Sequence, residues 1–234
     1  MFEIFASFGV ALGLIIGGDP EFAQIVALSL ELSLLAALAG AAVGLPFGAL
    51  VALGRFPGRT ALIIVLNALL GLPSVVVGLV VYLLLSRAGP LGSLGILFTP
   101  TAIVVAQTVL VIPIVAALAR QVAEDAWNEY REQLTSLGVS RMRAVPTILW
   151  DARFSLLTVV LAGFGRAASE VGAVMVVGGN IDGVTRVMTT AIALETSKGD
   201  LPLALALGIV LIAVVLAVNA GAYAIREWSA RHHG

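Results

Sequence analysis

Long apolar runs alternate with shorter polar segments along this chain, and the runs are the first guide to its structure. Five of them are long, over residues 28–53, 61–85, 101–118, 154–177 and 202–225. An α-helix of about 20 residues, rising about 1.5 Å per residue, crosses the roughly 30 Å hydrocarbon core of a lipid bilayer. The pattern therefore predicts an all-α fold, a bundle of about five membrane-spanning helices.

The amino-terminal segment, residues 1–20, is apolar but short and interrupted by glycine. It has no lysine or arginine ahead of its apolar run, which a cleavable signal peptide would have. The sequence GGDP at residues 17–20 is typical of a helix end. We therefore expect an interfacial or partly inserted helix within residues 1–20, a transmembrane domain over 21–225 and a tail over 226–234.

The longest polar segment, residues 120–153, lies between the third and fourth apolar runs. Steps of three, four and three residues place two aromatic and two leucine side chains on one face of a predicted helix: Trp127, Tyr130, Leu134 and Leu137. Gly138 follows at a position where glycine commonly ends a helix. Such an amphipathic helix either lies flat at the lipid interface or docks its apolar face in a groove of another protein. The residue pattern alone leaves both uses open.

Two further connections are rich in turn-forming residues. Residues 87–100 form a Gly/Pro-rich loop, and residues 178–200 are predicted to contain a short surface helix over 185–197. Pro202 opens the fifth run at a position where a helix tolerates proline. Prolines inside the first three runs predict kinks there, at Pro46, Pro73 and Pro113.

Composition supports a membrane location. Of 234 residues, 60% are hydrophobic and only 12% are charged, and the mean hydropathy is +1.08. These values lie far from those of an ordinary soluble domain, so we predict a multi-pass membrane protein. The chain has no cysteine, which excludes disulfide bonds and thiolate metal sites.

Basic residues are distributed unevenly between the two sides of the predicted five-span arrangement. Nine lie in or beside the first and third connections and the tail, namely Arg55, Arg59, Arg120, Arg131, Arg141, Arg143, Arg153, Arg226 and Arg231. Only Arg87, Arg186 and Lys198 lie on the other side. Because basic residues in short loops mark the cytoplasmic face, we expect the carboxyl terminus and residues 120–153 inside the cell and the amino terminus outside.

One ion pair is predicted within the membrane. Arg166 and Glu170 are four residues apart in the fourth run, which places them on one face of a helix. A charge at membrane depth costs several kcal/mol unless it is paired or hydrated. The pair either fixes the packing of this helix or lines a translocation pathway, and the sequence leaves both roles open.

Residue patterns of enzymes and metal sites are absent from the sequence. There is no glycine-rich phosphate-binding loop ending in Lys-Ser or Lys-Thr, and the single lysine, Lys198, lies on the outer side. The two histidines, His232 and His233, stand at the end of the chain, and no set of metal ligands or catalytic carboxylates is apparent. We therefore expect no catalytic residue, no metal and no cofactor, and uphill transport would need energy from a partner.

The polar segment resembles the coupling motif of ABC importer permeases. In that motif Glu-Ala-Ala is followed after three residues by Gly and after nine more by Ile-x-Leu-Pro, and here Glu132, Gly138 and Ile148 stand at those intervals. The chain departs from the motif at four positions, with Gln133 and Leu134 for the two alanines and Trp150 and Asp151 for Leu-Pro. The resemblance implies that the helix before Gly138 seats in a groove of a separate ATP-hydrolysing subunit.

Most of the chain beyond Gly18 is similar to the permease subunits of tungstate ABC importers, in a family that includes molybdate and sulfate permeases. The resemblance is carried above all by the run from FGRAASEVGA, at residues 164–173, through TRVMTTAIALETSKGD, at residues 185–200. It implies a type I ABC importer permease fold in the cell membrane and transport of an oxyanion, tungstate before molybdate or sulfate. An ion-coupled carrier or channel without an ATPase is the alternative from another class.

The same resemblance implies partners and contact residues. Two copies of the chain would form a homodimer around the translocation path, and each would contact one of two ATPase subunits. The residues implied in that contact are Trp127, Tyr130, Glu132, Leu134, Leu137 and Gly138. On the outer side, an oxyanion-binding protein would meet residues 87–100 and 178–200, with Asn180, Asp182 and Arg186 as implied contacts.

Overall fold

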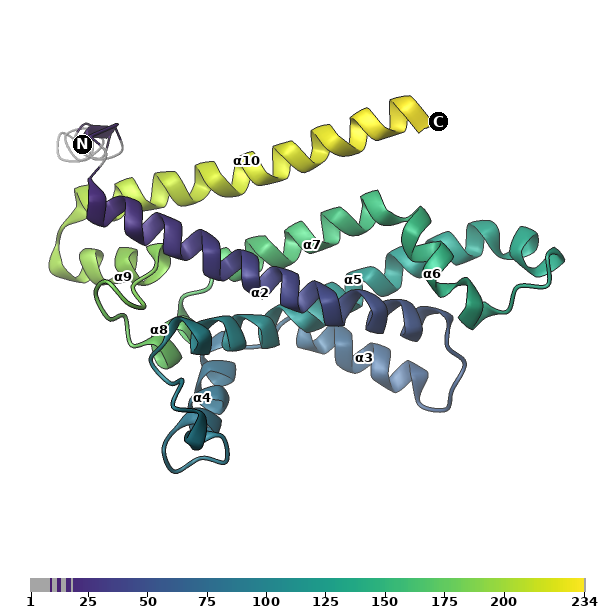
Figure 1. Ribbon diagram of the computed structural model, residues 1–234, viewed down its shortest axis with the longest axis horizontal. Helices are drawn as coiled ribbons and strands as arrows, with labels where there is room; N and C mark the ends of the chain where they lie inside the picture. The colour runs from purple at the N-terminus through teal and green to yellow at the C-terminus, as the bar shows by residue number, and fades with distance from the viewer. Residues whose placement is uncertain (1–8, 10–11, 14–15, 18, 234) are drawn as a thin grey trace. The chain divides into compact units, whose positions relative to one another are not determined.

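The described part of the chain consists of α-helices joined by short turns (Figure 1). The computed structural model describes residues 9, 12–13, 16–17 and 19–233. In chain order its elements are α2 (Pro20–Leu53), α3 (Arg59–Leu69), α4 (Ser74–Leu85), the short 3₁₀ turn η1 (Gly92–Leu94), α5 (Pro100–Ser136), α6 (Arg141–Asp151), α7 (Arg153–Ala168), α8 (Gly172–Gly178), α9 (Met188–Lys198) and α10 (Leu201–His233). The helix predicted within residues 1–20 lies mostly outside the described residues.

Three of the described helices have the length and apolar composition needed to cross a membrane, namely α2, α5 and the part of α10 over Leu201–Gly221. The number rises to five when each of two bent helix pairs, α3 with α4 and α6 with α7, is counted as one span. The prediction of an all-helical membrane protein with about five spans is thereby confirmed.

The first span starts earlier than predicted, because α2 begins at Pro20 and not at residue 28. The carboxylate of Asp19 accepts hydrogen bonds from the backbone N–H groups of Glu21 (2.9 Å) and Phe22 (3.0 Å). N–H groups in a first turn have no partner within the helix, and an aspartate before the helix satisfies them. The Asp-Pro sequence is therefore a helix start.

The second apolar run is divided between α3 and α4, which corrects the expectation of one helix over 61–85. Between them the N–H groups of Leu70, Gly71 and Leu72 each bond to the carbonyl three residues back. Pro73 then prevents continuation, because it has no N–H to donate and disfavours helical geometry in the preceding residue. It becomes the residue that precedes α4.

The third run and the first half of the polar segment form a single helix, α5, of 37 residues. This helix continues through Pro113, as α2 continues through Pro46. The sequence ALARQVAEDA at the junction, residues 117–126, is rich in residues with high helix propensity. Nothing in the local sequence therefore ends the helix where its character changes from apolar to polar.

Later elements also differ from the prediction. The fourth run breaks, since α7 ends at Ala168 and α8 begins at Gly172. The predicted surface helix forms as α9, but Met188, Thr189, Thr190 and Ala191 are buried, so its first turn belongs to the interior. α10 extends to His233, so residues predicted to form a tail continue the last helix.

The helices form two compact units, and the first contains α4, α8, α9 and the amino-terminal parts of α2, α5 and α10. Its core joins three helices through Phe22 and Ile25 of α2, Met188 and Ala191 of α9, and Ala206 and Leu207 of α10. The hydroxyl of Ser29 accepts a hydrogen bond of 2.6 Å from the backbone N–H of Met188. This polar contact fixes the start of α9 on α2.

The second unit contains α3, α6, most of α7, the carboxyl-terminal parts of α2 and α5, and the end of α10. Three glycines spaced four residues apart, Gly40, Gly44 and Gly48, form a stripe on α2 that faces α5. A Cβ atom added at Gly44 would lie 2.8 Å from side-chain atoms of Val115, and one at Gly48 would lie 2.4 Å from a carbonyl oxygen of α5. The absence of side chains at this glycine stripe therefore permits the close packing of α2 on α5.

Candidate functional site

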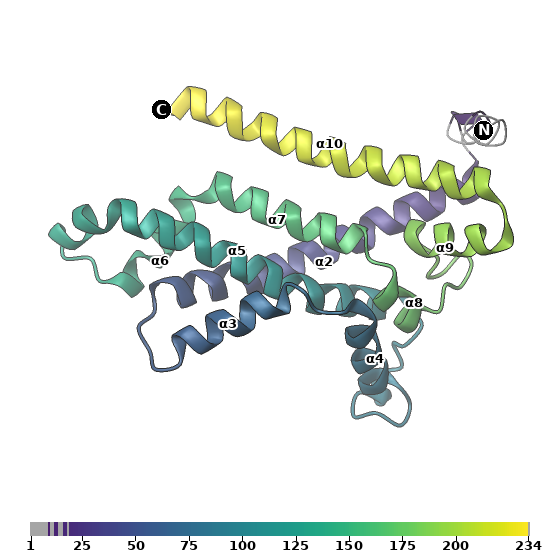
Figure 2. The ribbon, with the colours of Figure 1, turned by 180° about the vertical axis from the view of Figure 1, so that it is seen from behind.

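The polar segment folds as a helical hairpin, in which α6 lies alongside the carboxyl-terminal part of α5 (Figure 2). We call residues 120–151 the α5–α6 hairpin. Between its helices Gly138 has a φ of 71°, a left-handed conformation that favours glycine. The N–H of Gly138 bonds to the carbonyl of Thr135 (3.0 Å) and that of Val139 to the carbonyl of Leu134 (2.9 Å), which are the two bonds of a Schellman cap. The prediction that Gly138 ends the helix is confirmed.

The four side chains predicted to lie on one face of the helix have different surroundings. Trp127 is only 7% exposed and belongs to a buried cluster with Leu53 of α2 and Ile148 of α6. Leu134 is partly buried against the same cluster and Tyr130 is half-buried, whereas Leu137 is 76% exposed. The four side chains therefore differ in exposure: Trp127 is buried within the hairpin, and Leu137 is exposed.

The helix α6 explains why Trp127 is buried. No helix is predicted from the sequence between Gly138 and the fourth run, but Ala144 and Ile148 lie one turn apart on α6 and both belong to the Trp127 cluster. The apolar face of α5 is thus partly covered within the hairpin. The available signals were Ser140 before the helix and the four-residue spacing of the two apolar residues.

An apolar groove of about 210 Å³ remains open on the hairpin. Its walls include Tyr130 and Leu134 of α5, Leu137 just after α5, and Ile148 and Asp151 of α6. Because Leu137 is largely exposed at this groove, a partner side chain can bury additional apolar surface there. We call this surface the apolar groove.

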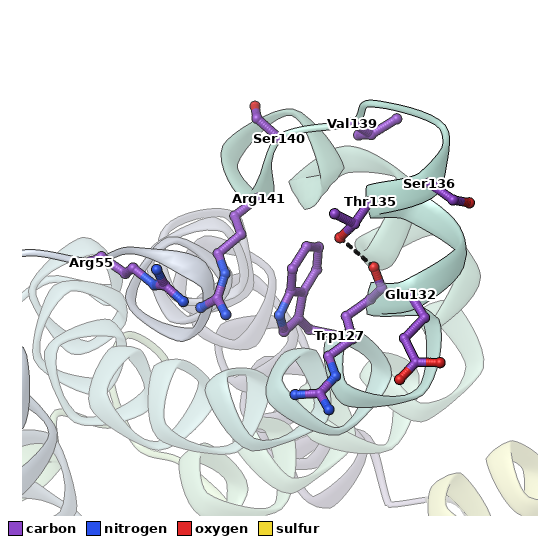
Figure 3. A pocket seen from close by; sticks show the side chains of 9 residues that line it. Arg55, Trp127, Glu132, Thr135, Ser136, Val139, Ser140 and Arg141 are labelled. Carbon is purple, nitrogen blue, oxygen red and sulfur yellow. Dashed lines mark hydrogen bonds between the residues drawn. The ribbon is translucent and has the colours of Figure 1, made fainter.

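A larger cleft of about 770 Å³ lies between the hairpin and the connection that follows α2 (Figure 3). Arg55, Arg131 and Arg141 line it together with Glu132 and the indole of Trp127. The guanidinium of Arg141 lies 5.1 Å from the centroid of the Trp127 ring, within the range of a cation–π contact. Among the described residues, no ion pair involves any of these three arginines. We call this surface the basic cleft.

A charged network fixes the end of α2 to α5. Arg59 donates hydrogen bonds to the carbonyl oxygens of Val51 (2.8 Å) and Ala52 (3.1 Å), and it pairs with Glu124. Glu124 also pairs with Arg120, which is almost fully buried. The last carbonyl groups of a helix have no partner within it, so Arg59 satisfies them and at the same time contacts α5.

Arg166 and Glu170 form the predicted ion pair. Glu170 is 2% exposed, and its carboxylate also accepts a hydrogen bond of 3.0 Å from the backbone N–H of Ala173, in the first turn of α8. Its backbone carbonyl accepts a hydrogen bond of 2.7 Å from the hydroxyl of Thr189 in α9. Glu170 thus joins α7, α8 and α9, while 30% of the Arg166 side chain remains exposed.

The turn between α8 and α9 contains the three residues that the resemblance implied as contacts of a binding protein. Arg186 has only 15% of its side chain exposed, pairs with Asp182 at 2.9 Å and lies 3.6 Å from a carboxylate oxygen of Glu21. Asn180 has a φ of 50°, and its side-chain oxygen is buried without a hydrogen-bond donor among the described residues. Asp182, with 65% of its side chain exposed, presents the largest surface of the three.

Comparison with known proteins decides the family. Residues 44–232 match the family described as the binding-protein-dependent transport system inner membrane component. The chain belongs to this family. It is therefore a membrane permease subunit, and subunits of this kind are not themselves enzymes. The family implies partners that hydrolyse ATP and that bind the substrate.

Several relatives of this permease subunit are named as permeases for tungstate, for an anion or for molybdenum. The tungstate uptake system permease protein TupB of Peptoclostridium acidaminophilum is 40% identical over 94% of this chain and 96% of its own. A probable anion ABC transporter permease protein of Haloferax volcanii is 40% identical over 84% of this chain and 87% of its own. The molybdenum transport system permease protein ModB of Escherichia coli is 30% identical over 91% of this chain and 95% of its own.

Proposed function

We propose that this permease subunit belongs to an ATP-driven importer of a tetrahedral oxyanion, with tungstate as the first candidate and molybdate or sulfate as the alternatives. The observation that carries the proposal is the 40% identity to a tungstate uptake permease over 94% of the chain, against 30% to a molybdenum permease. ATP hydrolysis takes place on a separate subunit, because this sequence contains no phosphate-binding loop.

The α5–α6 hairpin is the proposed docking element for the ATPase subunit. Support comes from the intervals between Glu132, Gly138 and Ile148 and from the apolar groove beside the exposed Leu137. Apolar surface buried in that groove contributes about 25 cal/mol per Å². Trp127 supports this groove from the interior of the hairpin, because it packs against α6 and so holds the two walls of the groove together.

A second copy of the chain would complete the translocation path. Only 17% of the most apolar stretch of α10, within Leu201–Gly221, is buried in one copy of the chain. The side chains of Ile212 and Leu216 on this helix are 62% and 63% exposed. In a membrane such a surface contacts lipid or another helix. Since the chain has no native cysteine, single cysteines introduced along α10 provide a test: disulfide-linked dimers in membranes are expected, and no cross-link at any position would contradict dimerisation through this helix.

Two further roles belong to the same proposal. The exposed edge of Arg166 suits the path of an oxyanion, because a guanidinium group presents several donors to a tetrahedral anion. The exposed Asp182 and the loop over residues 87–100 are proposed to meet the substrate-binding protein on the outer side.

Reconstitution tests the transport reaction. Proteoliposomes with the permease, its ATPase subunit and the oxyanion-binding protein should accumulate tungstate, measured by mass spectrometry, only when ATP and the binding protein are both supplied. Competition by molybdate and sulfate ranks the three anions. Accumulation that continues without the ATPase subunit would reject the proposal in favour of a carrier or channel.

The substitution Leu137→Glu tests docking at the apolar groove. Because Leu137 is 76% exposed, the variant should fold normally, yet it places a charge where the partner's apolar surface is expected. We expect at least a tenfold loss of permease-stimulated ATPase activity, since burying an unpaired charge costs more than the 1.4 kcal/mol that corresponds to a factor of ten. Leu137→Met, which keeps an apolar side chain of similar volume at the same position, is the matched control. Normal coupling in Leu137→Glu would exclude the groove as the docking site.

A further inference from the structure

The basic cleft is separate from the apolar groove, because no residue lines both. Apolar docking in the groove therefore does not account for the three arginines of the cleft, although Trp127 and Glu132, which the resemblance implies as ATPase contacts, also line it. The cleft also combines side chains from three parts of the chain: the connection after α2, the last turns of α5 and the start of α6. Its chemistry needs an explanation of its own.

Positive charge in the basic cleft is not compensated. Arg55, Arg131 and Arg141 contribute three positive charges and Glu132 contributes one negative charge, which leaves a formal charge of 3 − 1 = +2. Burial, together with the nearby charges of Arg55, Arg131 and Arg59, lowers the pKa of the Arg141 guanidinium. A concave surface lined by charges of one sign concentrates ions of the opposite sign.

Hydrogen-bond donors without acceptors surround the same cleft. The indole Nε1–H of Trp127 is buried and has no acceptor among the described residues. Figure 3 shows this indole on the wall of the cleft, with its nitrogen on the side of Arg141. The side chain of Ser140 makes no capping bond to the first turn of α6, so that N-terminus also lacks an acceptor from its cap residue. Backbone N–H groups at a helix N-terminus favour an anion.

We propose that the basic cleft binds a tetrahedral oxyanion of the phosphate type, held by the guanidinium groups of Arg55, Arg131 and Arg141. Guanidinium groups form paired, charge-assisted hydrogen bonds with such anions. A bound oxyanion would join the connection after α2 to the start of α6 and so stabilise the hairpin that carries the docking groove. A free oxyanion, including the transported one, and the phosphate of a lipid headgroup both have this chemistry.

The fluorescence of Trp127 measures binding directly. The chain contains three tryptophans. In a variant protein that carries both Trp150→Phe and Trp228→Phe, Trp127 is the one tryptophan left to report binding. The full-length protein in neutral detergent is titrated with sodium phosphate and with sodium tungstate, with chloride adjusted to hold ionic strength constant. A second titration uses mixed micelles containing phosphatidylglycerol or phosphatidylcholine.

We expect a saturable change in Trp127 fluorescence that Arg131→Gln weakens by at least about tenfold, as loss of a charge-assisted hydrogen bond predicts. Arg131 is exposed and forms no ion pair among the described residues, so this variant should keep its melting temperature. Arg143→Gln is the matched control, because Arg143 is an exposed arginine of α6 that does not line the cleft.

Each outcome has a defined meaning. Saturation by phosphate or tungstate without lipid supports a site for a free oxyanion, and saturation by phosphatidylglycerol alone supports a site for a lipid phosphate. The proposal is overturned if chloride produces the same change, if no titrant saturates, or if Arg131→Gln binds as tightly as Arg143→Gln. None of these results affects the docking proposal, which Leu137→Glu tests through ATPase coupling.

Discussion

Removing Arg166 alone should destabilise the protein more than removing the whole Arg166–Glu170 pair. Glu170 is 2% exposed in the intact protein, and after Arg166→Ala its carboxylate would keep one hydrogen bond, from the N–H of Ala173. Loss of one partner from a buried ion pair costs about 3–5 kcal/mol. Because 30% of the Arg166 side chain is exposed, the pair is only partly buried, so we expect a loss at the lower end of this range, about 3 kcal/mol.

The double variant Arg166→Leu with Glu170→Gln leaves no charge at this place. A glutamine side-chain oxygen can still accept the hydrogen bond from Ala173, so the cap of α8 is retained. Replacement of a buried pair by neutral groups of similar volume is often nearly neutral, and we expect a loss of about 1 kcal/mol or less. The difference between the single and double variants should therefore be about 2 kcal/mol.

Thermal and denaturant unfolding in detergent, followed by circular dichroism, measures these changes. Asp182→Ala is the matched control: it breaks another ion pair of four-residue spacing, but Asp182 is exposed and Arg186 retains Glu21 as a neighbour, so the loss should stay below about 1 kcal/mol. A single variant no less stable than the double variant would refute the reasoning. A double variant that folds but does not transport would assign Arg166 to the translocation path.

Three further substitutions test packing in the second unit by the same unfolding measurements. Gly44→Val should cost about 1–3 kcal/mol or prevent folding because its side chain overlaps Val115, whereas Gly208→Ala, in open space, should unfold like the parent protein. Arg59→Gln removes a charged donor from two carbonyl groups and leaves Glu124 with one partner, and we expect a loss of about 2 kcal/mol. Gly138→Ala places a Cβ atom on a residue in the left-handed conformation, which costs about 1–2 kcal/mol. This variant should also accelerate amide hydrogen exchange in the hairpin. Unchanged exchange would contradict the assigned cap.

Features governed by neighbouring residues were predictable from the sequence. The apolar runs identified the membrane class, and Gly138 marked a helix end because a left-handed cap depends on a single residue type. The contact between Arg166 and Glu170 followed from a four-residue spacing in one helix. In the last two cases the decisive interaction lies within about one helical turn.

Features governed by distant contacts were not predictable in this way. The burial of Trp127 depends on Ile148 in a different helix, and amphipathicity alone does not reveal whether a partner helix lies in the same chain or in another protein. At the break before α8, the carboxylate of Glu170 accepts a hydrogen bond from the backbone N–H of Ala173. This side-chain hydrogen bond competes with the backbone hydrogen bonds that would continue α7. The inward position of α9 likewise required its contacts with α2 and α10.

The glycine stripe of α2 restricts how this protein can diverge. Any side chain at Gly44 or Gly48 collides with α5, and at Gly48 the obstacle is a backbone carbonyl oxygen that no change of residue can remove. At Gly44 an added Cβ would lie 2.8 Å from both Cβ and Cγ1 of Val115 and 3.1 Å from the carbonyl oxygen of Ile112, so a smaller residue at 115 that keeps its Cβ does not make room. Among descendants of this sequence, positions 44 and 48 should therefore both stay glycine for as long as α2 packs on α5 in this way.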